Sequence, residues 1–223
     1  MLRVMLAGVL VGVAAVVTPP AAAEPQTCPP TCDEIPDTAW PEPWSLPLNS
    51  RYHWPRLADV AQPAPQSRFK FEELCRTPRQ RDDPRDYAVA AKAVVAHPDG
   101  QWQLQAQVLH WRGQTWHSGD VANQVFVAAV AALEACQVTA PEFSPSITTA
   151  QIDRMAAVIS GPQVVHQYLV VNPANASIAE LVLWTTPGAD GVPLVRWPMV
   201  PDERVLEAID APLCGAYLGS CGS

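Results

Sequence analysis

Residues 87–108, YAVAAKAVVAHPDGQWQLQAQV, hold the clearest pattern of secondary structure in the chain. Two runs of alternating apolar residues flank the turn His97-Pro98-Asp99-Gly100, which is typical of two antiparallel strands joined as a hairpin. The glutamines between the apolar residues are expected to face solvent. We therefore predict a sheet with one solvent-exposed face and one face packed against the core. These glutamines are Gln101, Gln103, Gln105 and Gln107.

Three later apolar runs extend this sheet. They are Met155–Ser160, Val164–Asn172 and Ser177–Thr185, and turn-forming Gly-Pro and Asn-Pro pairs separate them. This order favours a meander of antiparallel strands. Within the last run Leu181–Trp184 is apolar on both faces, which indicates a strand covered on both sides. Before these runs, residues 139–149 (TAPEFSPSITT) are predicted to form a loop.

Helices are expected between and after the strands. One is predicted to begin at a cap on Ser118 or Asp120 and to bury a face that includes Cys136. A short helix is expected at 69–75, and another from Pro201 through Ile209, interrupted by Pro212 and resuming to Leu218. The expected fold class is α+β, an antiparallel sheet of about five strands with helices packed on one face.

A proline-rich segment precedes the hairpin. From Glu24 to Pro65 prolines recur every few residues, and proline is incompatible with a regular helix or a central strand. Aromatic residues between the prolines favour an extended arm lying across the core over a free linker. We therefore divide the chain into a signal peptide (1–23), this arm (24–66) and a single α+β domain (67–223), stapled by disulfides.

The N-terminus has the features of an export signal. Arg3 is followed by fourteen apolar or small residues, Val4 to Val17, then by two prolines and an A-x-A pattern that ends at Ala23. The apolar run would span about 21 Å as a helix, less than the hydrocarbon core of about 30 Å. We predict cleavage after Ala23, secretion or residence in the cell-envelope space, and no membrane span in the mature protein.

Charge and composition exclude some partners. The chain has 22 acidic and 14 basic residues, a net charge of −8, which opposes binding to nucleic acid or anionic membranes. All basic residues except Lys70 and Lys92 are arginine. This bias is typical of GC-rich coding, so an actinobacterial source is expected.

The six cysteines predict three disulfides, because they follow an export signal. They are Cys28, Cys32, Cys75, Cys136, Cys214 and Cys221. One arrangement pairs Cys28 with Cys32 and Cys214 with Cys221, and leaves a Cys75–Cys136 bond worth about 4 kcal/mol. A competing arrangement links Cys28 or Cys32 to the C-terminal cysteines. The chain lacks the paired cysteine motifs of metal sites, and no metal is predicted.

Several catalytic motifs are missing from the sequence. It contains no phosphate-binding loop, no dinucleotide fingerprint, no G-x-S-x-G and no H-E-x-x-H. These absences exclude the enzyme classes that depend on them, and no cofactor is predicted.

The best polar candidates lie in residues 109–120, LHWRGQTWHSGD, between a strand and a helix. Two histidines and an aspartate there could hold a metal. We favour the alternative in which the two tryptophans anchor the loop and the histidines lie at the surface. The candidate ligand-binding residues are His110, Trp111, Trp116, His117 and Asp120.

Two other polar features each allow two interpretations. His166, inside a strand run, is predicted to be a hydrogen-bonded sheet residue, with a catalytic role as the alternative. Residues 76–86, RTPRQRDDPRD, are predicted to form a solvated loop. The alternative is an arginine site for an anionic ligand, which the nearby aspartates oppose. Its arginines would be Arg76, Arg79, Arg81 and Arg85.

The order of elements carries a resemblance to a known group of proteins. A strand pair, an alanine-rich helix ending in Ala-Leu-Glu-Ala-Cys136, apolar strands such as Gln163–Val171 and a last helix resemble the extracellular sensor domains of mycobacterial receptor kinases. The resemblance covers about Tyr87 to Cys221. It implies a disulfide-stapled α+β module with a ligand-binding cleft and no catalysis.

We therefore expect an exported, non-catalytic, sensor-like binding protein whose partner is a small molecule or an envelope component. The alternative is a secreted, hydrolase-like enzyme whose site is assembled from residues distant in sequence. A structural envelope protein is the third possibility.

Overall fold

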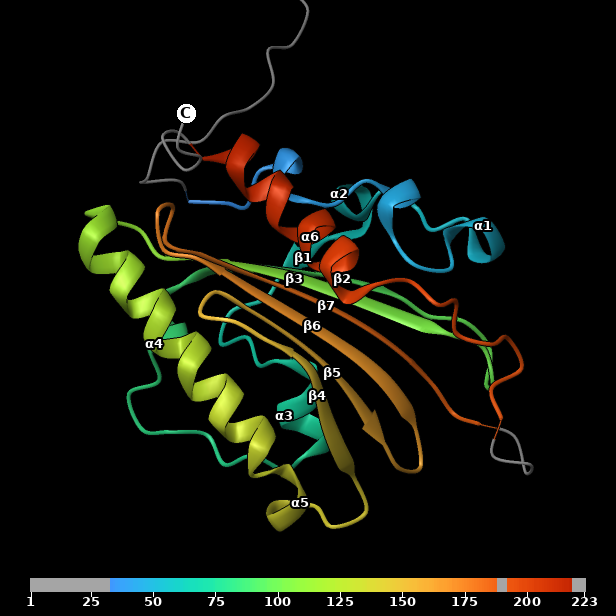
Figure 1. Ribbon diagram of the computed structural model, residues 1–223. Coiled ribbons are helices and arrows are strands. Elements are labelled where there is room, and N and C mark those ends of the chain that lie inside the picture. Colours follow the sequence, from blue (N-terminus) through green and yellow to red (C-terminus); the bar gives the residue numbers. More distant parts are fainter. Residues whose placement is uncertain (1–32, 188–191, 218–223) are drawn as a thin grey trace, which may run out of the picture.

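The computed structural model describes residues 33–187 and 192–217, so the predicted signal peptide, Cys28, Cys32 and Cys221 lie outside it (Figure 1). Its centre is a seven-stranded antiparallel sheet in the order β1-β2-β3-β7-β6-β5-β4. The strands are β1 (Gln62–Pro63), β2 (Val89–Val95), β3 (Gln103–His110), β4 (Ser144–Ala150), β5 (Arg154–Ser160), β6 (Val164–Asn172) and β7 (Ser177–Thr185).

The five predicted strands are present, and two edge strands were missed. The predicted hairpin is β2–β3, paired from Val89 with His110 to Val95 with Leu104. The missed strands are β1, which lies in the arm, and β4, which lies in the predicted loop. In the part of the chain that the structure describes, strand β4 pairs only with β5. An edge strand needs hydrogen bonds on one side only, so Pro145 is tolerated there.

Helices cover both faces of the sheet, which corrects the prediction of helices on one face. Helix α4 (Thr115–Glu134) lies below the sheet in Figure 1, and α6 (Asp202–Ala216) lies above it. The physical reason is the composition of β6 and β7, which carry mainly apolar residues on both sides and are almost entirely buried. A strand of this kind requires cover on each face.

Each face has its own hydrophobic core. The core on the α6 face includes Leu181 and Ile209 together with Trp54 of the arm. The core on the α4 face includes Phe126 and Leu169. The prediction of a solvent-exposed face was therefore wrong, because other parts of the chain cover that face. Gln105 and Gln107 are 4% and 0% exposed.

The described part of the arm crosses the α6 face, but it is not simply extended. It forms short helical turns, and its first turn packs against α6. Proline at the start of a turn is compatible with helical geometry, since that position needs no amide donor. The elements are η1 (Asp37–Ala39), η2 (Pro43–Ser45), α1 (Asn49–Tyr52), α2 (Leu57–Val60) and the edge strand β1.

The remaining helices differ from the predictions at their ends. Helix α4 begins at Thr115, before the predicted caps, and α6 continues through Pro212 instead of breaking there. Burial of Ile209 and Leu213 on either side of this proline keeps α6 packed on the sheet. The others are α3 (Lys70–Leu74), η3 (Pro84–Tyr87) and α5 (Cys136–Thr139). None of the helices within the described ranges is long and apolar enough to cross a membrane.

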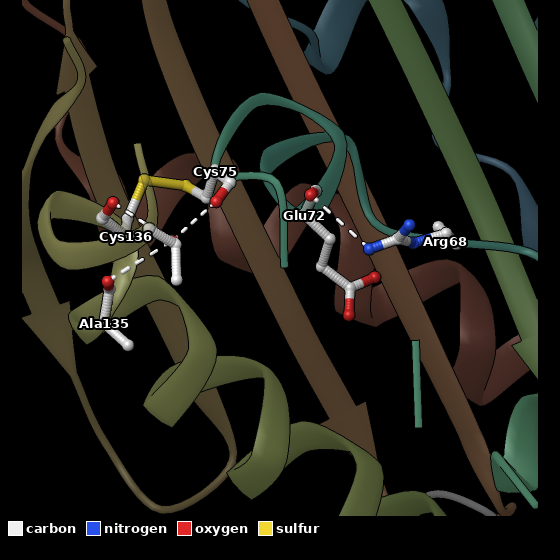
Figure 2. Close-up of a disulfide and its surroundings, with 6 residues drawn as sticks. Arg68, Glu72, Cys75, Ala135 and Cys136 are labelled. Atoms are coloured by element: carbon white, nitrogen blue, oxygen red, sulfur yellow. Dashed lines mark hydrogen bonds between the residues drawn. A yellow bond between two sulfur atoms is a disulfide. The ribbon is translucent and has the colours of Figure 1, made fainter. Parts of the chain in front are cut away.

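The predicted disulfide between Cys75 and Cys136 is present (Figure 2). It joins the residue after α3 to the first residue of α5, 61 positions later. Beside it the Thr139 hydroxyl donates to the Cys75 carbonyl over 2.6 Å. Cys214 is also disulfide-bonded, and the arrangement of Cys28, Cys32 and Cys221 lies outside the described residues. The crosslink fastens the segment that carries α3 to the end of α4.

Candidate functional site

The predicted residues of the 109–120 segment do not form one site. His110 faces α6, where its ring stacks on Tyr217 with centroids 4.3 Å apart and its Nδ1 lies 3.0 Å from the Ser177 hydroxyl. The next residue, Trp111, belongs to the core on the α4 face. Successive residues of a strand point to opposite sides, so the sheet separates these two side chains. His110 is therefore an interior packing residue.

The other three predicted residues lie near the start of α4. His117 lines a shallow groove with Trp111, while Trp116 and Asp120 line a neighbouring one. Trp111 is buried and donates from Nε1 to the Pro84 carbonyl over 2.9 Å, whereas Trp116 is 71% exposed. Within residues 33–187 and 192–217, no group of three His, Cys, Asp or Glu side chains could hold a metal ion.

His166 lies on the α6 face and has an aromatic environment. Its ring stacks on Trp197 with centroids 3.6 Å apart and is tilted against Trp102. Burial lowers the pKa of His166 to about 4, although the negative charge of Asp202 acts in the opposite direction. The imidazole is therefore neutral at pH 7, and its contacts are those of a packed interior residue.

One arginine of the predicted solvated loop is buried, which corrects that prediction. The Arg85 guanidinium donates to Glu72 over 2.5 and 3.0 Å and to Asp83 over 2.7 Å. Burial alone would raise the pKa of Asp83, but the hydrogen bonds and charge of Arg85 outweigh it and lower this pKa. A cleft of about 150 Å³ separates the cluster from α4. Because two carboxylates already engage Arg85, it is a poor candidate for anion binding.

A row of buried polar side chains on the α4 face was also missed. Glu180 of β7 is 1% exposed and accepts hydrogen bonds from the Lys70 amide (2.7 Å), Gln167 (2.9 Å) and Gln105 (3.3 Å). Gln107 lies opposite Glu180 in the sheet. Burial raises the pKa of Glu180 to about 7, although these hydrogen bonds act to lower it. The row attaches α3 to the sheet by polar contacts.

The most developed candidate site lies at the end of the sheet where three chain segments meet. These are the β2–β3 turn, the β5–β6 turn and the end of β7. They enclose a pocket of about 190 Å³, here called the corner pocket. Its lining consists of His97, Asp99, Gly100, Gln101, Gln103, Gln163, Trp184 and Thr186.

Local contacts hold the β2–β3 side of the corner pocket in place. The Gln103 carboxamide accepts from the His97 amide over 2.6 Å and donates to the His97 carbonyl over 2.7 Å. From the arm, the Tyr52 hydroxyl donates to Gln101 over 2.8 Å, and the rings of Tyr52 and Trp54, stacked on each other, both contact the His97 imidazole at a tilt. These contacts fix the pocket wall before any ligand arrives.

Two polar atoms in this lining have no protein partner. His97 Nε2 and Gln163 Oε1 are inaccessible to solvent and make no hydrogen bond within the described structure. Buried polar atoms are normally hydrogen-bonded, and an unpaired one costs about 1–3 kcal/mol. Because solvent cannot reach either atom, neither is presented to a ligand in the corner pocket.

Sequence reasoning recognised residues 97–100 only as a turn. The usable signal was the antiparallel order of the strands, which brings the end of β2, the start of β6 and the end of β7 to one end of the sheet. Neither a family model nor a curated protein matches this chain.

Proposed function

We propose that this chain is an exported, non-catalytic binding protein of the cell envelope or the extracellular space. The observation that carries the proposal is the corner pocket, whose β2–β3 wall is held in place by Gln103 and Tyr52 without a ligand. Small-molecule sites are typically concave and preformed, with a few polar groups that orient the ligand. A sensor-like role fits the same geometry, since a sensor domain must bind a ligand without converting it.

The side chains support binding over hydrolysis. Enzymatic hydrolysis through a nucleophile requires a base that is itself oriented by a third group. His97 and Asp99 both line the corner pocket, but no hydrogen bond joins them among the described residues. Among the described residues the buried acidic side chains are Glu72, Asp83 and Glu180, and all three are already bound to interior donors. Within residues 33–187 and 192–217, the secreted-enzyme alternative thus has no assembled catalytic group to support it.

The disulfide between Cys75 and Cys136 supports export, because such bonds persist in oxidising compartments. Sequencing of the mature N-terminus tests this part of the proposal. We expect the protein recovered from an actinobacterial host to begin at Glu24, and a chain that begins at Met1 inside the cytoplasm would refute export.

Native mass spectrometry of the protein, purified gently from its envelope or medium, tests the binding function. We expect a small molecule to be retained at one equivalent and released unchanged after denaturation. A preparation that retains nothing and binds no member of a metabolite library would refute the binding function. Release of a chemically altered compound would instead establish the enzyme alternative.

A further inference from the structure

We propose that residues 24–32 of this chain, EPQTCPPTC, occupy the groove at the start of α4 that is lined by Tyr87 and His117, here called the Tyr87 groove. This inference is independent of the proposed binding function. It assigns the occupant of one exposed surface, and its failure would leave the proposed function standing.

The Tyr87 groove combines aromatic and cationic side chains. It has a volume of about 250 Å³, and its lining includes Tyr87, Trp111, Arg112, His117 and Val121. Trp111 is 4% exposed, whereas the side chain of Tyr87 is 72% exposed. A segment that covers the Tyr87 ring would bury apolar area, which stabilises the contact.

The part of the chain outside the described residues joins the described part at this groove. The carboxylate of Asp33, the first described residue, pairs with the Arg112 guanidinium over 2.5 Å, and Arg112 lines the groove. Residues 24–32 come directly before Asp33. As a polyproline II helix, at about 3.1 Å per residue, they would extend about 28 Å. The length of the segment therefore does not prevent it from reaching across the groove.

The composition of the segment suits an aromatic groove. Three of its nine residues are proline, namely Pro25, Pro29 and Pro30. Segments rich in proline favour the polyproline II conformation, and grooves lined by aromatic side chains are a recurrent binding surface for it. Because proline restricts the free segment as well, less conformational entropy is lost when the segment docks.

Hydrogen-bonding groups and charges are complementary as well. Proline has no amide N–H, so a segment rich in proline presents mainly carbonyl acceptors. The Tyr87 hydroxyl and the Arg112 guanidinium are donors in the lining. The described lining contains no acidic side chain, while residues 24–33 contain two acidic side chains and no basic one.

The neighbouring groove provides a contrast. It is lined by Trp116 and Asp120, and the aspartate would repel an acidic segment. Trp116 is 71% exposed, almost the same fraction as Tyr87. Exposure alone thus does not distinguish the two grooves, whereas the position of Asp33 and the charge of the lining favour the Tyr87 groove.

Nuclear Overhauser measurements on the mature, disulfide-bonded protein with ¹³C-labelled proline test the occupant directly. We expect cross-peaks between the ring protons of Tyr87 and those of Pro29 or Pro30. Cross-peaks from these prolines to α6 alone would overturn the inference. Proline signals with the shifts and sharp lines of a free peptide would overturn it as well. Because this measurement uses the unmodified protein, it does not depend on the folding of a variant.

Replacement of one exposed aromatic residue tests the groove, in variants that keep all six cysteines. In the unmodified protein we expect ¹⁵N order parameters of about 0.85 for the amides of Gln26 and Thr27, the value of a rigid backbone. Tyr87→Ala should lower them to below about 0.6, because it removes the exposed side of the groove. Trp116→Ala is the matched control and should leave them unchanged. Equal effects of the two substitutions, or no effect of Tyr87→Ala, would refute the assignment.

A second copy of the chain could supply the same segment. A mixture of ¹³C-proline-labelled and unlabelled protein separates the two cases, because contacts between labelled and unlabelled molecules arise only when the segment is exchanged between copies. We expect no such intermolecular cross-peaks. Their presence would overturn docking within one chain and would identify the groove as an interface between copies.

Discussion

Replacement of Glu180 by glutamine isolates the titration of the buried polar row. The amide oxygen of the introduced side chain can keep the hydrogen bonds that Oε1 of Glu180 accepts from Lys70 and Gln167. The new amide nitrogen would then face Gln105, whose own carboxamide can turn to present its oxygen. Glu180→Gln is thus expected to preserve the fold and remove the ionisable group.

The size of the effect follows from the pKa of Glu180. Burial raises this pKa from 4.5 to about 7, so the folded protein holds a proton that the unfolded chain releases between those pH values. The resulting stabilisation is fully present below pH 4.5 and is lost as the pH rises through 7. At about 1.36 kcal/mol per pKa unit it amounts to about 3 kcal/mol. About 2.5 kcal/mol of this should disappear between pH 5 and pH 8.

Urea unfolding at pH 5, 6, 7 and 8, with the disulfides intact, measures the effect as a difference between the two proteins. His166 contributes an opposite slope below pH 6.5, because burial lowers its pKa to about 4, but it is present in both. We expect the free energy of unfolding of the wild type, relative to Glu180→Gln, to fall by about 2.5 kcal/mol from pH 5 to pH 8. A difference that stays constant to within about 0.5 kcal/mol would refute the reasoning.

Two further substitutions test the packing. Gly119→Ala should destabilise the protein by about 1–3 kcal/mol in urea unfolding, because a Cβ there would lie 2.2 Å from the Pro173 carbonyl oxygen. The matched control Gly215→Ala meets no atom within 4 Å and should be neutral or stabilising, so equal losses would contradict this explanation. Joint replacement of Cys75 and Cys136 by alanine should cost about 4 kcal/mol, and an unchanged urea midpoint would show that the crosslink is dispensable.

Alternation along the chain was enough to predict the β2–β3 hairpin but not the environment of each face. The spacing of the glutamines shows that Gln105 and Gln107 share a face. It does not show that Ser67 and Arg68 cover that face and bind Gln107 from about 40 residues earlier in the chain. Contacts at this separation leave no periodic signal, so burial of the glutamines was not predictable.

Edge elements were missed for a different reason. Strand β4 contains Pro145 and has one apolar side chain facing the core, Ile147. Its alternation is too weak to separate it from a loop, because an edge strand is stabilised mainly by backbone pairing with its neighbour. The start of α4 was misplaced because no side chain caps it, so the usual polar marker is missing.

The sequence alone could have shown that the residues of the predicted site do not lie together. Extension of the β3 pattern by one residue, from His110 to Trp111, places these two side chains on opposite faces, which excludes them from a common site. The corner pocket, in contrast, was not predictable from the sequence alone. Gln103 and Trp184 become neighbours only through the pairing of β3 with β7, which skips the strands between them in sequence.

The buried polar side chains fall into two groups with different experimental consequences. Glu180 and Arg85 are surrounded by interior partners, so their substitution changes an existing network and should appear as altered stability. His97 Nε2 and Gln163 Oε1 have no partner to lose. Gln163→Ala should therefore leave the free energy of unfolding unchanged or slightly increased. A clear loss of stability in urea unfolding of Gln163→Ala would show that its carboxamide has an interior partner and would place it in the first group.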